Sequence, residues 1–364
     1  MKSIQVHLGE RSYPVIVGKG AFCSLNRHLR VSAAGDLACI VANARVRRLW
    51  GKTLSNGLKK AGCRFYFHTI PDSELGKSWS NAEKIVNGLS GWAGKGRLFV
   101  IALGGGVTGD VAGFAASVFK RGVPFIQIPT TLLAQVDSAI GGKNGVDLRT
   151  GKNLAGTFYQ PKLVLSDTDF LSTLDRRQIN SGMAEVIKYG FIADSNLLNF
   201  LEAAREKIVK RIPKAMEFIV SGCSSIKARY VEKDEFDTGE IRMALNFGHT
   251  FGHALEAAAG FRRYSHGEAI GWGMLCALRL SEKLGILKDK NALPRLERLL
   301  RAYGLPLKAR GIDAGRLLSA FGKDKKFIGG MNRVVLLEKQ GRVRIKRNIP
   351  LKMIKEEIRE LSVN

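Results

Sequence analysis

Three of the chain's six histidines fall in the short segment 249–266. Asn246, His249 and His253 follow one another at i, i+3 and i+7, so a helix here would place all three on one face. His266 comes next, after a short basic break that contains glycine. Imidazoles on a helix face commonly hold a divalent metal, and a catalytic site usually adds a carboxylate. Two histidines at i, i+4 also occur on faces that are merely polar, but the third histidine and Asn246 favour a metal site.

The length and composition of the chain indicate a globular protein, and we expect two domains to position this site. Its 364 residues exceed what one hydrophobic core usually organises. A hydrophobic content of 45% with 41 glycines favours a globular enzyme over a disordered or fibrous chain. No apolar run approaches a membrane span, and the N-terminal residues resemble an alternating strand rather than a secretory signal. Five scattered cysteines without a CxxC pair favour reduced thiols in the cytoplasm and argue against a thiolate zinc site.

The formal net charge of +26 is unusual and raises nucleic acid or an anionic surface as a partner. However, the basic residues are spread along the chain. The densest cluster, Lys323–Lys326, is interrupted by Asp324 and lacks the alternating aromatic residues of a stacking surface. We therefore attribute the charge to a basic cytoplasm or an anionic substrate, and expect neither a specific nucleic-acid partner nor a membrane.

Strands and helices alternate in the first part of the chain, which predicts an α/β domain with a parallel sheet. A helix is predicted at Ser78–Trp92. The predicted strands are Tyr13–Val17, Leu37–Val41, Arg64–His68, Arg97–Leu103, Phe125–Ile128 and Leu163–Ser166. From about Arg176 helical patterns dominate, apart from one predicted hairpin, Arg333–Leu337 with Arg342–Lys346. A domain boundary is expected near 170–178.

A glycine-rich turn, GGGVTGD at Gly104–Asp110, follows the buried strand Arg97–Leu103 and leads into an Ala/Gly-rich helix that extends to Lys120. Backbone N–H groups at such a turn and helix N-terminus can hold a diphosphate. The pattern is neither the GxGxxG fingerprint nor a Walker loop, and a turn that serves only the fold would look similar.

Two further stretches carry charged residues in suggestive positions. In the polar, glycine-rich segment Pro129–Asn153, Lys143 and Lys152 each follow a glycine and could approach an anion closely. Glu185 and Lys188 stand at i, i+3 on a predicted helix. Such a pair is usually a solvated ion pair, but its apolar neighbours favour a carboxylate turned toward a site.

Together and in this order, the motifs resemble those of the 3-dehydroquinate synthases, within the sugar-phosphate cyclase family. The resemblance rests on PxxExxKS at 71–78, GGGVTGD at 104–110, KRG at 120–122, PTTLLAQVDSAIGGK at 129–143, GKNLAGTFYQP at 151–161, MAEVIKYG at 183–190, LNFGHTFGH at 245–253, HGE at 266–268 and DKK at 324–326. It implies an N-terminal Rossmann-like NAD-binding domain over 1–174, and a mainly α-helical metal- and substrate-binding domain over 175–364. It also implies an active site in the interdomain cleft and a homodimer.

The resemblance implies conversion of 3-deoxy-D-arabino-heptulosonate 7-phosphate to 3-dehydroquinate and phosphate, in the shikimate pathway of aromatic amino acid biosynthesis. The steps would be NAD-mediated oxidation, phosphate elimination, reduction and intramolecular aldol. Oxidation comes first because elimination needs an acidified proton beside the phosphate. NAD would be regenerated at each turnover. One divalent ion, zinc or cobalt, would orient the hydroxyls and lower their pKa.

Carried over by motif, the implied metal ligands are Glu185, His249 and His266. Spacing alone would pair His249 with His253, whereas the resemblance makes His253 a proton relay or a substrate-hydroxyl residue. The implied residues for the substrate carboxylate and hydroxyls are Asp137, Lys143, Lys188, Lys227 and Asn246. The implied phosphate binders are Lys152, Asn153, Arg242 and one of Lys325 and Lys326, with Arg121 of the partner subunit. The implied NAD contacts are Asn43, Glu74, Lys77, Gly106, Val107, Thr108, Gly109, Asp110, Thr130, Thr131, Asp137 and the segment 143–153, including Lys143 and Lys152.

Two positions depart from the family pattern. The usual TDxNV at a strand end is ANARV here, so Asn43 stands where an Asp is expected to hold the adenosine ribose, and Asn144 replaces the usual Thr after GGK. An amide offers one acceptor oxygen where a carboxylate offers two. We therefore expect looser NAD binding and weaker rejection of NADP, with Arg45 and Arg47 close in sequence.

Three alternatives remain at this point. A sibling cyclase acting on sedoheptulose 7-phosphate or glucose 6-phosphate would share fold, NAD and metal. A metal-dependent polyol dehydrogenase of related architecture would release NADH. A non-enzymatic nucleic-acid binder would leave the acidic and histidine positions unexplained. The cationic set, which includes Lys227, Arg242 and the DKK motif, favours a substrate with both carboxylate and phosphate.

Overall fold

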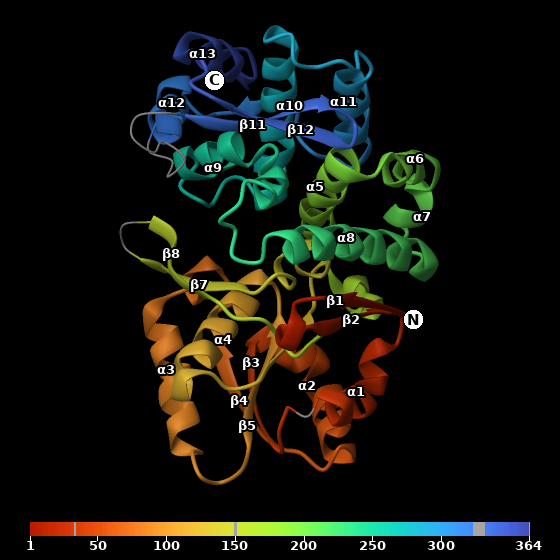
Figure 1. Cartoon of the computed structure of the whole chain (residues 1–364), viewed down its shortest axis with the longest axis vertical. Helices are drawn as coiled ribbons and strands as arrows, with labels where there is room; N and C mark the ends of the chain where they lie inside the picture. The colour runs from red at the N-terminus through yellow and green to blue at the C-terminus, as the bar shows by residue number, and fades with distance from the viewer. Residues whose placement is uncertain (33, 149–150, 323–331, 364) are drawn as a thin grey trace. The chain divides into compact units, whose positions relative to one another are not determined.

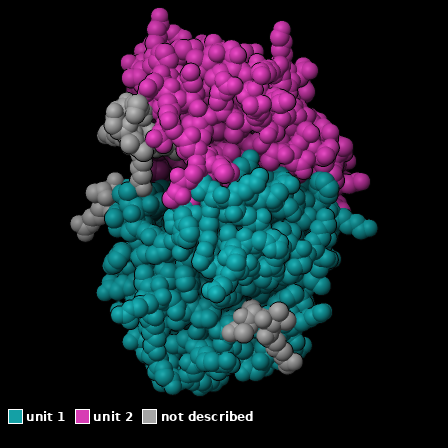
Figure 2. Space-filling model, viewed as in Figure 1, with its two compact units in different colours: residues 1–174, 213–236 teal, residues 175–212, 237–364 magenta. Residues whose placement is uncertain are grey.

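The computed structural model describes residues 1–32, 34–148, 151–322 and 332–363 (Figure 1). Lys325 and Lys326 lie outside these described residues. The chain forms two compact units, coloured separately in Figure 2. Unit 1 comprises Met1–Leu174 with Pro213–Phe236, and unit 2 comprises Asp175–Ile212 with Asp237–Asn364. No helix in the described ranges is long and apolar enough to cross a membrane.

Unit 1 is built on a seven-stranded sheet with the order β1-β2-β9-β6-β5-β3-β4. All neighbouring strands are parallel except β1, which pairs antiparallel with β2. The strands are β1 (Lys2–Val6), β2 (Tyr13–Gly18), β3 (Leu37–Asn43), β4 (Arg64–Ile70), β5 (Leu98–Gly104), β6 (Phe125–Pro129) and β9 (Leu163–Asp167). The six strands predicted in this part of the chain are therefore confirmed.

Helices cover both faces of this sheet because successive strand residues point to opposite sides. In β3, Ile40 packs with the helices of one face and Cys39 with those of the other. The first face is covered by α1 (Leu25–Ser32) and α2 (Ala44–Lys60), and the second by α3 (Trp79–Gly91) and α4 (Gly106–Val118) (Figure 1). A parallel sheet buried on both faces explains the continuous apolar runs of the strands. The remaining short helices of unit 1 are η1 (Gly9–Arg11), η2 (Ala21–Ser24), η3 (Glu74–Gly76), η4 (Phe119–Arg121), η5 (Ala134–Ser138) and η6 (Thr168–Thr173).

Two features of unit 1 were not predicted. The polar segment before residue 160 contains a two-stranded hairpin of β7 (Lys143–Leu148) and β8 (Gly151–Phe158). Here a side chain on Gly145 would place Cβ 2.7 Å from the carbonyl oxygen of Ala155, so glycine permits the close pairing. Helix α8 (Pro213–Lys233), which the sequence division grouped with the second domain, packs against β1, β2 and η5.

Unit 2 is mainly helical, and the predicted hairpin near its end is confirmed as β11 (Arg333–Lys339) with β12 (Arg342–Arg347). Its longest helices, α5 (Arg176–Ala193) and α10 (His266–Lys283), pack against each other and are largely buried. The other elements are α6 (Ser195–Ala203), α7 (Arg205–Val209), η7 (Arg242–Asn246), α9 (His249–Ala258), α11 (Ala292–Ala302), β10 (Ala309–Arg310), α12 (Ala314–Gly322), α13 (Leu351–Glu360) and β13 (Ser362–Val363).

Candidate metal centre and cofactor-binding groups

The helix that carries the histidines begins at His249 and not before it. Asn246 ends the separate short helix η7, and Gly248 between them adopts φ +81°, a left-handed conformation that favours glycine. A Cβ at Gly248 would also lie 2.8 Å from the backbone nitrogen of Met274 in α10. The expectation that Asn246 shares one helix face with His249 and His253 is therefore wrong, because this glycine breaks the helix.

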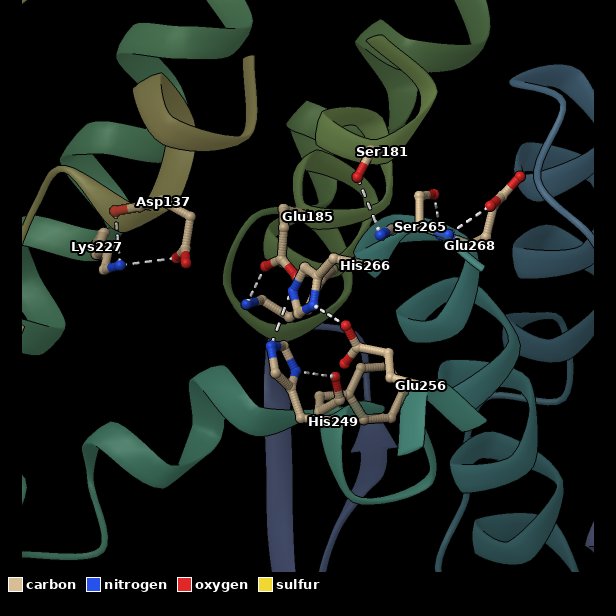
Figure 3. A network of polar contacts seen from close by, with 12 residues as sticks. Asp137, Ser181, Glu185, Lys227, His249, Glu256, Ser265, His266 and Glu268 are labelled. Carbon is tan, nitrogen blue, oxygen red and sulfur yellow. Dashed lines mark hydrogen bonds and ion pairs between the residues drawn. The ribbon is translucent and has the colours of Figure 1, made fainter. Parts of the chain in front are cut away.

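The start of α10 is fixed by two sets of hydrogen bonds. Ser265 and Glu268 form a capping box, in which the Ser265 N–H donates to Glu268 Oε2 at 2.7 Å and the Glu268 N–H donates to Ser265 Oγ at 3.3 Å. The Gly267 N–H donates to Ser181 Oγ on α5 at 3.0 Å. These bonds anchor the first turn of α10 to α5 and direct His266 toward Glu185 (Figure 3).

The side chains of Glu185, His249 and His266 converge as metal ligands would. Glu185 Oε1 lies 3.6 Å from His249 Nε2 and 3.5 Å from His266 Nε2. Ligand atoms about 2.0–2.2 Å from a tetrahedral zinc ion lie roughly 3.3–3.6 Å apart. The donor set of one carboxylate and two imidazoles fits a catalytic zinc or cobalt site, because it leaves coordination positions open for a substrate.

The carboxylate of Glu185 is fully buried and needs a partner charge. Lys188, one turn along α5 and 1% exposed, forms an ion pair with Glu185 Oε2. The other oxygen, Oε1, faces the two imidazoles. His249 Nδ1 lies 3.3 Å from the carbonyl oxygen of Phe247, a partner for an Nδ1–H that leaves Nε2 for a metal. The i, i+3 pair thus lies within the candidate site and not in solvent.

The second imidazole, His266, lies between two carboxylates. Its Nδ1 is 3.4 Å from Glu256 Oε1, on the side of the ring opposite Glu185. Burial opposes the charged form, but the two carboxylates outweigh it and raise the pKa of His266 to about 10. The ring of His266 therefore lies where two carboxylates favour a positively charged group.

His253 belongs to α9, the helix of His249, and its side chain is exposed. Its ring centroid is 5.4 Å from that of His249 and 6.3 Å from that of His266. Together with Glu256 and His266 it forms a second group of potential ligand atoms. Glu256 was missed in the sequence, although it stands at i+7 from His249 and i+3 from His253 on α9, a spacing that signals the same helix face.

In unit 1, two residues of the predicted NAD set, Asp110 and Asn153, contact Lys77. This lysine is buried, with Nζ 2.5 Å from Asp110 Oδ2 and hydrogen-bonded to Asn153 Oδ1. Asp147 Oδ1 accepts from the Asn153 N–H at 2.8 Å. Burial lowers the pKa of Lys77, but Asp110, Asp147 and Glu74 raise it to above its ordinary value. Asp147 itself was not singled out, because nothing in its local sequence marks it.

The glycine turn lies where strand β5 passes into helix α4, as predicted, with α4 ending at Val118 instead of Lys120. The Thr130 N–H donates to the Gly104 carbonyl at 2.9 Å, and a Cβ on Gly105 would lie 3.2 Å from Thr131 Cγ2. The predicted Gly106, Val107, Thr108 and Gly109 form the first turn of α4. Lys152 Nζ contacts Glu74 Oε1 at 2.9 Å. Two predicted cofactor residues that lie far apart in the sequence, Glu74 and Lys152, are therefore in contact.

The substrate residues predicted in unit 1 are only partly clustered. Lys227 Nζ donates to the Asp137 carbonyl at 2.7 Å and to its Oδ1 at 2.8 Å (Figure 3). Lys143 is exposed, with Nζ 5.9 Å from the centroid of the Phe158 ring. Arg121 is also exposed. In unit 2, Arg242 is 3% exposed within η7.

Asn43 has both ends of its amide occupied within the chain. Its Oδ1 accepts from the Val46 N–H at 2.7 Å and caps α2, and its Nδ2 donates to Asp72 Oδ1 at 2.6 Å. Asp72 follows β4, which is paired with β3, so both residues stand at the same edge of the sheet as the glycine turn. Asp72 was missed, although it lies inside the PxxExxKS motif.

The chain matches family models over most of its length. A model described as 3-dehydroquinate synthase N-terminal matches residues 67–181, and one described as 3-dehydroquinate synthase C-terminal matches residues 182–327. A curated 3-dehydroquinate synthase from Syntrophotalea carbinolica is 42% identical over 336 residues, which cover 92% of each chain.

Solved structures of related cyclases share the fold. A 2-deoxy-scyllo-inosose synthase, solved with carbaglucose-6-phosphate, NAD⁺ and Co²⁺, aligns with a TM-score of 0.89 at 26% identity, over 99% of this chain and 100% of its own. A 2-epi-5-epi-valiolone synthase from Streptomyces hygroscopicus subsp. jinggangensis, solved with NAD⁺ and Zn²⁺, aligns with a TM-score of 0.85 at 27% identity, over 98% of both chains.

Proposed function

Because this chain belongs to the 3-dehydroquinate synthase family, we propose that it converts 3-deoxy-D-arabino-heptulosonate 7-phosphate into 3-dehydroquinate and phosphate. The observation that carries the proposal is the convergence of Glu185, His249 and His266, whose possible ligand atoms lie within 4.8 Å of one another. An α/β unit with a glycine turn accompanies it, as a dinucleotide requires.

We propose that the cofactors are NAD, held by unit 1, and one divalent ion, held by unit 2. When bound, NAD would accept and return a hydride, and the ion would act as a Lewis acid on adjacent substrate oxygens. Lys77, Glu74 and the first turn of α4 are the groups proposed to hold the dinucleotide.

The chain's own charged residues supply the remaining chemistry. Lys188 neutralises Glu185 in the buried site and presents an ammonium beside the proposed ligands. Lys227, held by Asp137, is a cation suited to the substrate carboxylate. Arg242 and Lys152 are proposed for the phosphate, whose departure preorganised cations would stabilise. His253, beside His249, is proposed to move protons between the substrate hydroxyls and solvent.

The proposal extends to the state of the protein. None of its five cysteines forms a disulfide, which suits a reducing cytoplasm. We also propose a homodimer in which Arg121 of the partner subunit reaches the phosphate. Its side chain is exposed and therefore accessible to another chain.

Two alternative enzymes are separated by their substrates and by the fate of the cofactor. Sibling cyclases are represented by structures that are 26% and 27% identical, against 42% for the curated 3-dehydroquinate synthase. We expect phosphate release from the heptulosonate phosphate, and at most traces from sedoheptulose 7-phosphate or glucose 6-phosphate. A polyol dehydrogenase would accumulate NADH with glycerol. Phosphate release only from a sugar phosphate that lacks a carboxylate would contradict the proposal. NADH accumulation without phosphate release would also contradict it.

A further inference from the structure

The imidazole of His266 faces a carboxylate on each of its nitrogens. Nε2 lies 3.5 Å from Glu185 Oε1, and Nδ1 lies 3.4 Å from Glu256 Oε1 (Figure 3). Glu185 belongs to α5, Glu256 to the last turn of α9, and His266 is the first residue of α10. Three helices therefore contribute to the placement of one ring.

Glu256 is held where it can act on that ring. Its side chain is only 12% exposed. Helices α9 and α10 pack closely, since a Cβ on Gly252 would lie 3.0 Å from the carbonyl oxygen of Ala269. The close approach of α9 to α10 and the cap at Ser265 thus hold the two helices that carry Glu256 and His266.

The second nitrogen of a metal-bound imidazole usually donates its hydrogen to a carboxylate or a carbonyl. That bond fixes the tautomer and the ring orientation, and it makes the ligating nitrogen more basic. His249 has such a partner in the carbonyl oxygen of Phe247, 3.3 Å from Nδ1. For His266, the group in the equivalent position is the carboxylate of Glu256.

We propose that Glu256 is a positioning residue for the metal centre: it accepts the Nδ1–H of His266 and thereby aims Nε2 at the ion. This inference rests on the metal centre of the proposed function.

The group His253, Glu256 and His266 could instead hold an ion of its own. That arrangement would require His266 Nδ1 to act as a ligand, so the ring would lose both N–H protons to bridge two ions. One ion at Nε2 leaves Nδ1–H for Glu256.

Cobalt binding to the full-length protein tests the proposal without reference to turnover. The variants are Glu256→Ala and the near-isosteric Glu256→Gln, which keeps an acceptor oxygen without the charge. Glu282→Gln, an exposed carboxylate on α10, is the matched control. We expect one Co²⁺ per chain in the wild type, a roughly 10–100-fold weaker affinity in Glu256→Ala, and a smaller loss in Glu256→Gln. The visible absorption of bound Co²⁺ should shift in the Ala variant and return toward wild type in the Gln variant.

Three results would overturn the role of Glu256. The first is a cobalt affinity within twofold of wild type, with an unchanged absorption spectrum, in both variants. The second is a second Co²⁺ in the wild type that either variant loses, because Glu256 would then be a ligand. The third is a lower thermal stability with an unchanged cobalt absorption of the folded protein, which would indicate a merely structural role. A wild type that binds no cobalt would contradict the metal centre of the proposed function. That result differs from an unaffected variant, which would contradict only the role of Glu256.

Discussion

Asn43 donates from Nδ2 to Asp72 Oδ1 at 2.6 Å while its own Oδ1 caps helix α2 through the Val46 N–H. The amide thus links the ends of two neighbouring parallel strands, β3 and β4. A carboxylate at position 43 could still cap the helix but could not donate to Asp72. The Asn43 amide is therefore paired with an acidic neighbour that a carboxylate at this position would repel.

The first prediction follows from this pair. Asn43→Asp should destabilise the protein by about 1–3 kcal/mol at pH 8, because a hydrogen bond to a charged group becomes a repulsion. Repulsion raises the folded-state pKa of a carboxyl, so the loss should shrink as the pH falls toward about 4. Denaturant unfolding at several pH values measures it. Asn43→Ser, which keeps a capping oxygen without charge, is the control, and equal stability of the Asn43→Asp variant and the wild type at pH 8 would contradict the pair.

The second prediction concerns the metal ligands. His249→Ala and His266→Ala should lose bound zinc, since each removes one of three ligands that converge within the reach of a single ion. His253→Ala should keep its zinc and turn over more slowly. Metal content after dialysis and phosphate release are the two measurements. Loss of zinc in His253→Ala with retention in His266→Ala would show that the ligand set is wrong.

A third prediction concerns the buried ion pair of Glu185 and Lys188. Lys188→Met leaves a fully buried carboxylate without this cation, which typically costs about 3–5 kcal/mol. A bound divalent ion would supply positive charge to the same carboxylate. We therefore expect the loss to be largest in metal-free protein and smaller with zinc, as measured by denaturant unfolding in both states. Equal losses in the two states would mean that the ion does not contact Glu185.

The fourth prediction concerns Arg242, which is buried in η7 although it carries a charge. If it binds the substrate phosphate, Arg242→Gln should weaken substrate binding by about one to two orders of magnitude, because one charge-assisted hydrogen bond contributes roughly 1.5–3 kcal/mol. Arg347→Gln, at an exposed ion pair on β12, is the control. Steady-state kinetics and direct binding measure the change. Unchanged binding of the phosphate substrate by Arg242→Gln would remove this residue from the site.

The sequence predicted the strands of unit 1 because their apolar runs are long and parallel strands are buried on both faces. The convergence of Glu185 with His249 and His266 rested on the family motifs, since spacing alone favoured His253. What escaped prediction depends on three-dimensional contact. Gly248 separates Asn246 from the histidine helix, α8 joins the first unit, and the contact of Asp72 with Asn43 joins side chains at the ends of two different strands. Glu256 could have been found from its helical spacing to His249 and His253, but its contact with His266 comes from the packing of two helices.

The central claim is that one ion and a recycled NAD drive phosphate elimination, and the molar ratio of phosphate released to NAD supplied tests it most directly. Metal-depleted protein is reconstituted with zinc, and NAD is supplied at a concentration below that of the enzyme. The absorbance of NADH and the amount of released phosphate are then measured over time. The account predicts many phosphates per NAD, no accumulation of NADH, and no release without zinc or cobalt. Release of at most one phosphate per NAD, with matching NADH, would contradict it.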